Sequence, residues 1–422
     1  MADDGDSGGG ALRAGARLRP AQGPPPRHRL AEIPVIRAVR ADRPRAFRRV
    51  AVSLNAARLT GIVCALLALP AAQASAQSPA SNASVVLYGV VDLGLAGIDD
   101  TDLGSSHGMQ TGMQSGSRWG LRGREDLGGG MYTRFQLESG VLANSGRSAQ
   151  GGRLFGRAAW LGIGGAWGEL RAGRQTSMSS ELLAEFDPFL ASYLNLGAQT
   201  ALLPFNANRA DNSLSWRAPL AGGWRFALDH SFDTGPGGGF ATHDSNRLNS
   251  AALAYESGST ALALTYEGAR WAANTTEGRA MAAAGGDAQP WAVTLAARHT
   301  HGPATLYLAY SHMRNGSTIP AVPSPGQTPY FPGSTVHGVL AGLGWRVGAG
   351  TIMASWQVSR PGDGGALRRQ GATHTQHIPS IGYSHDLSAR TNVYAILGQL
   401  HGAWDDPCWR QTQYAVGLRH RF

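Results

Sequence analysis

The sequence predicts an all-β protein, an antiparallel β-barrel that crosses a membrane. Three observations predict this fold: apolar side chains recur at every second position from Val85 onward, no apolar run of about 20 residues lies beyond residues 1–76, and short and long connections alternate. Successive side chains of a strand point to opposite faces, so each segment has one apolar face and one polar or mixed face. Because unpaired backbone groups are costly in hydrocarbon, a sheet that spans a membrane must close on itself.

Composition separates the chain from ordinary soluble proteins. It has 422 residues, 58 of them glycine, and only 15% of its residues are charged, while 42% are hydrophobic. Soluble globular chains average about 7% glycine and about 25% charged residues. An apolar content without long apolar runs suits strands that lie between two environments.

The net charge of +9 is unevenly distributed. All 37 basic residues are arginine, and residues 1–76 carry seven more arginines than acidic residues, whereas the rest of the chain carries only two more. A nucleic-acid-binding protein should concentrate its basic surplus on its folded domain. We therefore expect no nucleic-acid partner.

The first 76 residues indicate a leader followed by an export signal. Residues 1–50 are rich in Arg, Pro, Gly and Ala without apolar periodicity, as expected for disorder. Within residues 51–76, an apolar run from Gly61 to Leu69 precedes the small-residue site Ala74-Ser75-Ala76. This pattern predicts a secretory signal peptide cleaved before Gln77, with a short core helix as the alternative.

The leader is unusually long for a secreted protein. A translation start nearer Val52 or Leu54 is one hypothesis for it, which peptides from residues 1–45 in mass spectrometry would exclude. Residues 77–422 form the expected mature domain. Of the two cysteines, Cys64 lies in the export segment and Cys408 alone remains, so no disulfide framework is expected.

Sixteen segments of the mature domain show the alternation of a strand. In one of them, Trp224, Phe226 and Leu228 alternate with polar or small residues. The sixteen segments are 85–97, 115–126, 130–140, 152–164, 168–175, 212–219, 224–232, 246–256, 261–270, 289–299, 304–314, 334–347, 350–359, 372–385, 391–402 and 411–422. A water-soluble β-sandwich would also alternate, but the export signal and the rhythm of loop lengths favour the barrel.

The last segment carries a pattern of its own. Tyr414, Val416, Leu418 and Phe422 share one face, and Arg419 and Arg421 point to the other. An arginine facing lipid near the bilayer midplane costs about 2–4 kcal/mol, so both arginines are expected to face the lumen. An aromatic residue at the end of an alternating strand resembles the signal that outer-membrane assembly machinery recognises.

Several further motifs follow one another in order along the mature domain. They are Val85-Val86-Leu87-Tyr88-Gly89-Val90-Val91-Asp92, Ser115-Gly116-Ser117-Arg118-Trp119-Gly120-Leu121-Arg122-Gly123-Arg124-Glu125-Asp126-Leu127-Gly128-Gly129-Gly130, Phe135-Gln136-Leu137-Glu138-Ser139-Gly140, Trp160-Leu161-Gly162, Gly168-Glu169-Leu170-Arg171-Ala172-Gly173-Arg174-Gln175 and Asn212-Ser213-Leu214. Together these motifs resemble Gram-negative trimeric porins, particularly the betaproteobacterial and neisserial branch. The resemblance implies a sixteen-stranded barrel with an inward-folded constriction loop, located in the outer membrane. It also implies a homotrimer in contact with outer-membrane lipid and lipopolysaccharide, which passes small hydrophilic solutes and ions.

The resemblance further assigns a pore constriction. The segment 176–211 matches the inward loop, and its acids Glu181, Glu185 and Asp187 match the acidic side of the constriction. By motif, the basic wall opposite comprises Arg118, Arg134, Arg157, Arg174 and Arg209. Because candidate arginines outnumber candidate acids, we expect a mild preference for anions.

Three functional alternatives follow. A general diffusion porin is the leading interpretation. The second is a substrate-selective channel for small anions, which would differ because its solute would block the conductance in a saturable way. A barrel that serves as an enzyme or adhesin would need a catalytic set at its rim or larger surface loops, and neither is found, so no enzymatic activity is expected. His374, His377 and His385 lack a fixed metal-ligand spacing, and we expect no metal and no cofactor.

Overall fold

The computed structural model describes residues 84–194, 196–202, 209–234, 245–283, 289–316, 330–369 and 371–422. The predicted leader 1–50 and signal peptide 51–76 lie outside these residues.

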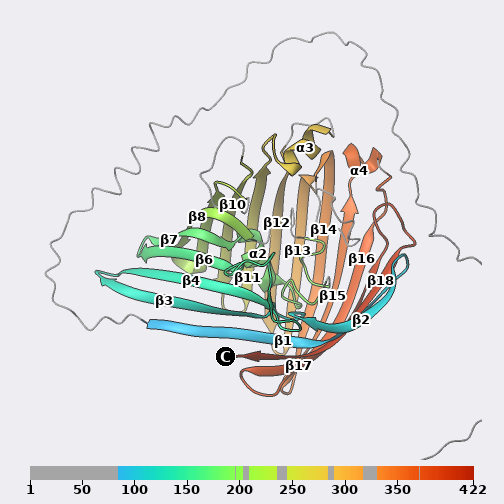
Figure 1. Ribbon diagram of the computed structural model, residues 1–422. Coiled ribbons are helices and arrows are strands. Elements are labelled where there is room, and N and C mark those ends of the chain that lie inside the picture. The colour runs from blue at the N-terminus through green and yellow to red at the C-terminus, as the bar shows by residue number, and fades with distance from the viewer. Residues whose placement is uncertain are drawn as a thin grey trace, which may run out of the picture. The chain divides into compact units, whose positions relative to one another are not determined.

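Sixteen antiparallel strands of the described residues form a closed ring (Figure 1). In ring order they are β1 (Ser84–Asp100), β3 (Arg118–Gly128), β4 (Met131–Leu142), β6 (Ala158–Gly165), β7 (Gly168–Thr176), β8 (Arg209–Pro219), β9 (Trp224–Ser231), β10 (Arg247–Ser257), β11 (Thr260–Arg270), β12 (Trp291–His301), β13 (Ala304–Gly316), β14 (Tyr330–Val347), β15 (Gly350–Pro361), β16 (Gln376–Asp386), β17 (Thr391–His401) and β18 (Arg410–Arg421). The predicted sixteen-stranded antiparallel barrel is confirmed.

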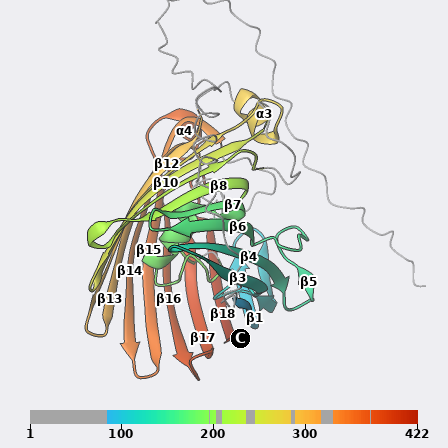
Figure 2. The ribbon, with the colours of Figure 1, turned by 90° about the vertical axis from the view of Figure 1, so that its left-hand side faces the viewer.

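Short elements fill the long connections. They are the strands β2 (Gly104–Thr111) and β5 (Arg147–Ser148), the helices α2 (Met178–Leu183), α3 (Thr276–Ala283) and α4 (Gly365–Arg369), and the 3-10 turns η1 (Ala184–Phe186) and η2 (Ala221–Gly223). In the described part of the chain, no helix is both long and apolar enough to cross a membrane. Figure 2 shows α3 and α4 at one end of the strands, here called the loop side; the end with the short connections is called the turn side.

The ring closes where β1 pairs with β18, from Val90 opposite Arg421 to Asp100 opposite Gln411. Just beyond the paired residues, the amide of Gly89 donates to the carbonyl of Phe422 at 3.0 Å, and the amide of Phe422 donates to the carbonyl of Gly89 at 3.1 Å. The first and last strands are thus joined by backbone hydrogen bonds, which leaves no open sheet edge between them.

Each predicted segment overlaps one ring strand, and the differences are local. The predicted strand 152–164 begins only at Ala158, because Gly151 and Gly152 adopt positive φ in a turn. The strands β2 and β5 were not predicted, since Gly104–Thr111 has no apolar alternation and β5 has two residues. On the turn side, Gly128, Gly129 and Gly130 all have positive φ, which makes the tight β3–β4 connection possible.

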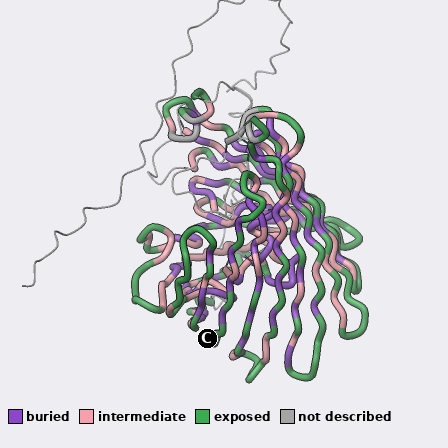
Figure 3. Tube along the Cα trace, turned by 90° about the vertical axis from the view of Figure 1, so that its right-hand side faces the viewer, coloured by how far each residue is buried: buried purple, intermediate pink, exposed green. Residues whose placement is uncertain are grey.

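The two faces of the barrel differ as the alternation predicts (Figure 3). On β13, the side chain of Leu308 is 60% exposed, whereas its neighbour Ala309 is buried. Exposed leucines, valines and aromatic residues continue this apolar outer surface over the other strands. An apolar exterior is expected where the barrel meets lipid.

The segment after β7 packs on the inner face. Phe189, Tyr193 and Leu196 are buried in one cluster with Ile378 and Tyr394 of the barrel wall. A second cluster joins Leu183, Phe186 and Leu202 of the segment to small residues of β11–β13 and to Leu340. The side-chain Nε2 of Gln357 in β15 donates to the carbonyl of Leu196 at 2.7 Å. These contacts hold the segment against the inner wall.

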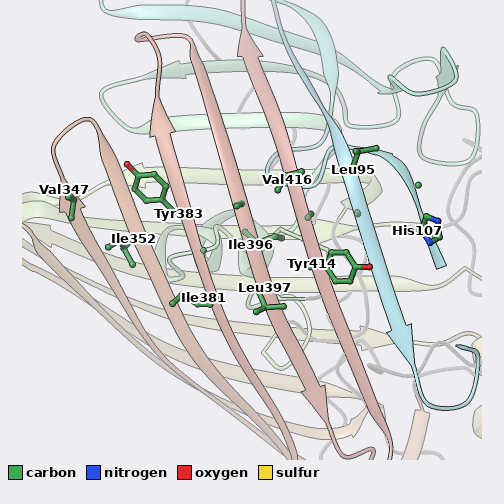
Figure 4. A pocket seen from close by; sticks show the side chains of 15 residues that line it. Leu95, His107, Val347, Ile352, Ile381, Tyr383, Ile396, Leu397, Tyr414 and Val416 are labelled. Atoms are coloured by element: carbon green, nitrogen blue, oxygen red, sulfur yellow. The ribbon is translucent and has the colours of Figure 1, made fainter. Parts of the chain in front are cut away.

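An apolar hollow of about 880 Å³ lies on the other side of the same wall. Figure 4 shows Leu95, Ile381, Leu397 and Tyr414 around it. These side chains are among the exposed apolar residues of the exterior, so the hollow faces lipid and is no site for a hydrophilic solute.

Candidate functional site

Four of the five predicted wall arginines are brought together on the inner face. Arg118 is the first residue of β3, Arg157 directly precedes β6, Arg174 lies in β7, and Arg209 is the first residue of β8. All four residues lie at or near the loop-side ends of β3, β6, β7 and β8. These strands belong to one continuous part of the ring, with β4 between β3 and β6. We call Arg118, Arg157, Arg174 and Arg209 the arginine cluster.

Glu138 of β4 joins two members of the cluster. Its carboxylate lies 2.6 Å from the Nε atom of Arg157 and 3.5 Å from the Nε atom of Arg118. The hydroxyl of Tyr88 donates to the same carboxylate at 2.8 Å. Arg118 also donates to the carbonyl of Gly116 at 2.9 Å. These contacts hold both guanidinium groups in place. The guanidinium group of an arginine that only faced water in the lumen would not be held in this way.

Asp211 joins the other side of the cluster. Its Oδ1 atom accepts from Nη1 of Arg174 at 2.6 Å and from Nη1 of Arg153 at 2.8 Å. Arg209 donates from Nε to the carbonyl of Arg157 at 3.1 Å and lies within electrostatic range of Arg174 and Glu138. Arg153, Asp211 and Glu138 thus complete the site.

The balance of charge in this region is positive. The arginine cluster and Arg153 supply five guanidinium groups, and Glu138 and Asp211 supply two carboxylates, an excess of three positive charges. Rings of basic side chains favour anions in water-filled pores. The region is therefore suited to attract small anions and to orient polar solutes.

Arg134 does not join the arginine cluster, which corrects the prediction for this residue. It faces the lumen as predicted from its outward neighbours, but it pairs with Glu169 at 3.0 Å. Arg134 is four residues from Glu138 along β4, or roughly 13 Å at the rise of a strand. It lies toward the turn side, beside Arg171 and the ring of Trp160.

Asp187 is the second correction. Its side chain is 0% exposed, so it does not line the lumen. The carboxylate accepts hydrogen bonds from the backbone amides of Phe189, Ala191 and Ala198 at 2.6–3.0 Å. Burial raises the pKa of the Asp187 carboxyl to about 6, although the three amides oppose that shift. Asp187 therefore stabilises the turn of the inner segment through these hydrogen bonds.

The other two predicted acids are accessible. Glu181 is exposed and lies 2.6 Å from Arg217 of β8. Glu185 is partly exposed, and within the described residues its carboxylate has no hydrogen bond or ion pair. Its backbone carbonyl accepts from Arg298 of β12 at 3.3 Å.

The placement of Glu185 gives the lumen two charged sides. The turn η1 that carries Glu185 contacts β12 and β13. In ring order β12 lies eight strands from β3, which carries Arg118, and eight strands are half of a sixteen-stranded ring. Glu185 and Arg118 thus stand on opposite sides of the barrel.

The sequence signals for the missed residues were present but incomplete. The alternation of β4 already placed Glu138 on the same face as Gln136 and Arg134. Nothing in the pattern showed that Glu138 and Asp211 pair with arginines from other strands, because such pairs depend on register. Arg153 lies in a long connection, where no periodicity indicates which way its side chain points.

The proposed assembly residues occupy the outer face of β18. Tyr414, Val416, Leu418 and Phe422 are 42–54% exposed, and Arg419 is buried on the lumen side opposite Asp92. The alternation of this strand is therefore as predicted.

Comparisons with known proteins agree with this geometry. A sequence profile described as Gram-negative porin matches residues 63–403. An outer membrane porin protein of Bordetella pertussis is 33% identical over 399 residues, which cover 86% of this chain and 99% of that protein. Outer membrane porin protein 32 of Delftia acidovorans is 33% identical over 183 residues, covering 40% of this chain and 49% of that protein.

A solved structure shares the fold. The anion-selective porin from Comamonas acidovorans superposes with a TM-score of 0.63 and 25% identity, over 81% of this chain and all of that chain. The profile spans well over half of the sequence, and the Bordetella relative aligns along nearly its full length. The chain therefore belongs to the Gram-negative porin family and forms a channel in the outer membrane.

Proposed function

We propose that the lumen is a general diffusion pathway for small hydrophilic solutes and ions, with a mild preference for anions, and that segment 176–211 narrows it. The observation that carries the preference is the excess of three positive charges in the region of the arginine cluster. The description of the Comamonas relative as anion-selective supports the same sign. Opposed rows of guanidinium groups and carboxylates would favour solutes whose dipoles align across the gap.

Reversal potentials test the proposed selectivity. In a planar bilayer with a potassium chloride gradient, the wild-type channel is expected to give a reversal potential of the anion-selective sign. The variant Arg118→Gln/Arg174→Gln/Arg209→Gln is expected to shift it toward the cation side, because Glu138, Asp211 and Glu185 then face fewer positive charges.

The matched control removes three arginines that lie outside the lumen. Arg270 and Arg410 are exposed at strand ends and Arg390 lies in a turn, so the variant Arg270→Gln/Arg390→Gln/Arg410→Gln is expected to keep the wild-type potential. A cation-selective wild-type channel, or equal shifts in both variants, would refute the proposal.

A substrate-selective channel for small anions is the second candidate. The convergence of four arginines from four neighbouring segments favours it, since such a group could hold one anion. Saturating block of chloride current by a small dicarboxylate would support this candidate. Permeation that falls smoothly with solute size, without block, would support general diffusion.

The assembly state and partners are further parts of the proposal. The family resemblance supports a homotrimer, surrounded by outer-membrane lipid and lipopolysaccharide, and assembled through the C-terminal strand. An oligomer that persists on an unheated SDS gel and converts to monomer on boiling is expected. A protein that runs as a monomer at every temperature, and by light scattering in mild detergent, would contradict the trimer.

A further inference from the structure

Two arginines and two histidines lie side by side on the exterior of β13, β14 and β15. His337 of β14 is directly opposite His312 of β13 on one side and Arg360 of β15 on the other. Arg314 is two residues further along β13, opposite Thr335. We call Arg314, His312, His337 and Arg360 the exterior basic patch.

The patch faces outward, at the loop side. His312 and Arg314 share the face of Leu308 and Tyr310, which are 60% and 43% exposed, while the residues between them are buried toward the lumen. On β15, Arg360 shares the face of Trp356, which is 53% exposed. The four side chains therefore lie outside the pore, on the surface that meets lipid.

Rows of apolar residues lie directly below the patch. Tyr310, Val339 and Val358 form the next row across the three strands, two residues or roughly 7 Å further from the loop side. Tyrosine and tryptophan on a barrel exterior mark the boundary between hydrocarbon and lipid head groups. The hydroxyl of Tyr310 lies 2.8 Å from Nδ1 of His337, so the patch begins directly above the row that contains this tyrosine.

The other end of the same strands lacks such a patch. There the outward rows are Leu306 with Leu343, and Ala304 with Trp345 and Ile352. Nor do the described outward positions of β13–β15 carry any aspartate or glutamate. Arg314 and Arg360 have no ion pair with any described residue, so no described carboxylate balances their positive charge.

The two arginines can act on one ligand. They flank β14 on strands about 10 Å apart, and both side chains are long enough to converge over the strand between them. His337 lies on the strand between them, its ring centroid is 5.2 Å from that of His312 on β13, and both rings offer further hydrogen-bond donors. Guanidinium groups bind phosphate oxygens by paired, charge-assisted hydrogen bonds.

We propose that the exterior basic patch binds the phosphorylated head group of a lipid in the loop-side leaflet, with the lipid chains lying along the apolar rows below. The position at head-group level, the unbalanced arginines and the apolar rows beneath fit an amphiphile better than a free anion. The lipid would anchor β13–β15 to the membrane surface. The inference concerns the exterior and does not rest on the selectivity proposed for the lumen.

Native mass spectrometry of the full protein in mild detergent tests the proposal. The probes are diphosphoryl lipid A, the same lipid after removal of both phosphates, and inorganic phosphate. Wild type is expected to bind diphosphoryl lipid A and to bind the dephosphorylated lipid at least about tenfold more weakly, since each basic side chain near a charged lipid contributes appreciably. Inorganic phosphate at low millimolar concentration is expected not to displace the lipid.

The variants separate a binding role from a folding role. Arg314→Gln/Arg360→Gln is expected to weaken binding of the phosphorylated lipid about tenfold or more, and Arg314→Lys/Arg360→Lys is expected to restore part of it. The matched control Arg346→Gln/Arg390→Gln removes two arginines at the turn side and is expected to bind like wild type. Heat modifiability on SDS gels verifies that each variant is folded.

Three results would overturn the inference: equal binding by the glutamine variant and the control, equal binding of the dephosphorylated lipid, or displacement by inorganic phosphate. Reversal potentials are measured on the same samples. A wild-type channel that binds the lipid but lacks anion preference would refute the selectivity alone, so the two proposals fail separately.

Discussion

At the scale of single residues, Asp187 shows how a charged group can serve the fold of a loop inside a channel. Its carboxylate accepts three backbone amides and is completely buried. Glu181 and Glu185 belong to the same segment, but both of their side chains are accessible. In the structure the role of holding the loop belongs to Asp187, because the chain turns back on itself immediately after it.

Asp187 predicts a pH dependence of the inner segment. Burial raises its pKa from the ordinary 3.8 to about 6, so the folded segment binds the proton more tightly than the unfolded one. Proton binding by Asp187 therefore stabilises the folded segment fully below about pH 4, and this stabilisation is lost as the pH rises through 6. The free energy involved has an upper limit of about 3 kcal/mol. We expect hydrogen exchange of the amides in 187–198, corrected for intrinsic rates, to be less protected at pH 7 than at pH 4.

Two variants identify the group that causes this pH dependence. Asp187→Asn carries no titratable group and is expected to show no change in protection between pH 4 and pH 7. Glu185→Gln, two residues away on a partly exposed side chain, is expected to behave like wild type. A pH effect that persists in Asp187→Asn would show that another group is responsible.

At the scale of strands, the two faces of β13 make a sharp prediction. Leu308→Arg places a charge on the lipid side and is expected to lower the free energy of unfolding by about 2–4 kcal/mol. Thr305→Arg, three residues away on the lumen side of the same strand, is expected to cost much less because water can solvate the group. Denaturant titration in lipid vesicles, followed by tryptophan fluorescence, measures both; equal losses would contradict the assigned faces.

The C-terminal strand makes a second prediction at this scale. The backbone of Phe422 exchanges two hydrogen bonds with Gly89, and the Phe422 ring lies over that glycine. Phe422→Ala is expected to reduce the folded, heat-modifiable fraction in outer membranes several-fold, whereas Phe422→Tyr keeps the aromatic ring and most of the yield. An unchanged yield in Phe422→Ala would show that the residue is not part of the assembly signal.

Strands were more predictable from the sequence than the contacts between them. All sixteen ring strands were found because a face in lipid and a face in water impose a period of two, for example over Trp224–Ser231. By contrast, the pairing of Glu138 with Arg157 depends on the register between β4 and β6, which a long connection joins. The separation of Arg134 from the arginine cluster follows from its distance along β4, which a motif match cannot measure.

At the scale of the whole molecule, the barrel assigns different chemistry to its two surfaces. Inside, arginines from β3 to β8 stand opposite the segment that carries Glu185. Outside, apolar rows cover the strands, and basic residues appear only near the loop side of β13 and β15 among the rows described above. A sixteen-stranded ring is wide enough to leave an aqueous lumen even with a segment folded against its wall.

Single-channel recording of the chain from residue 77, refolded and added to a planar bilayer, tests this account most directly. The account predicts discrete conductance steps that rise with salt concentration, as expected of a water-filled pore. A chain that folds into the membrane, with strand content and heat modifiability intact, yet gives no conductance steps would contradict it.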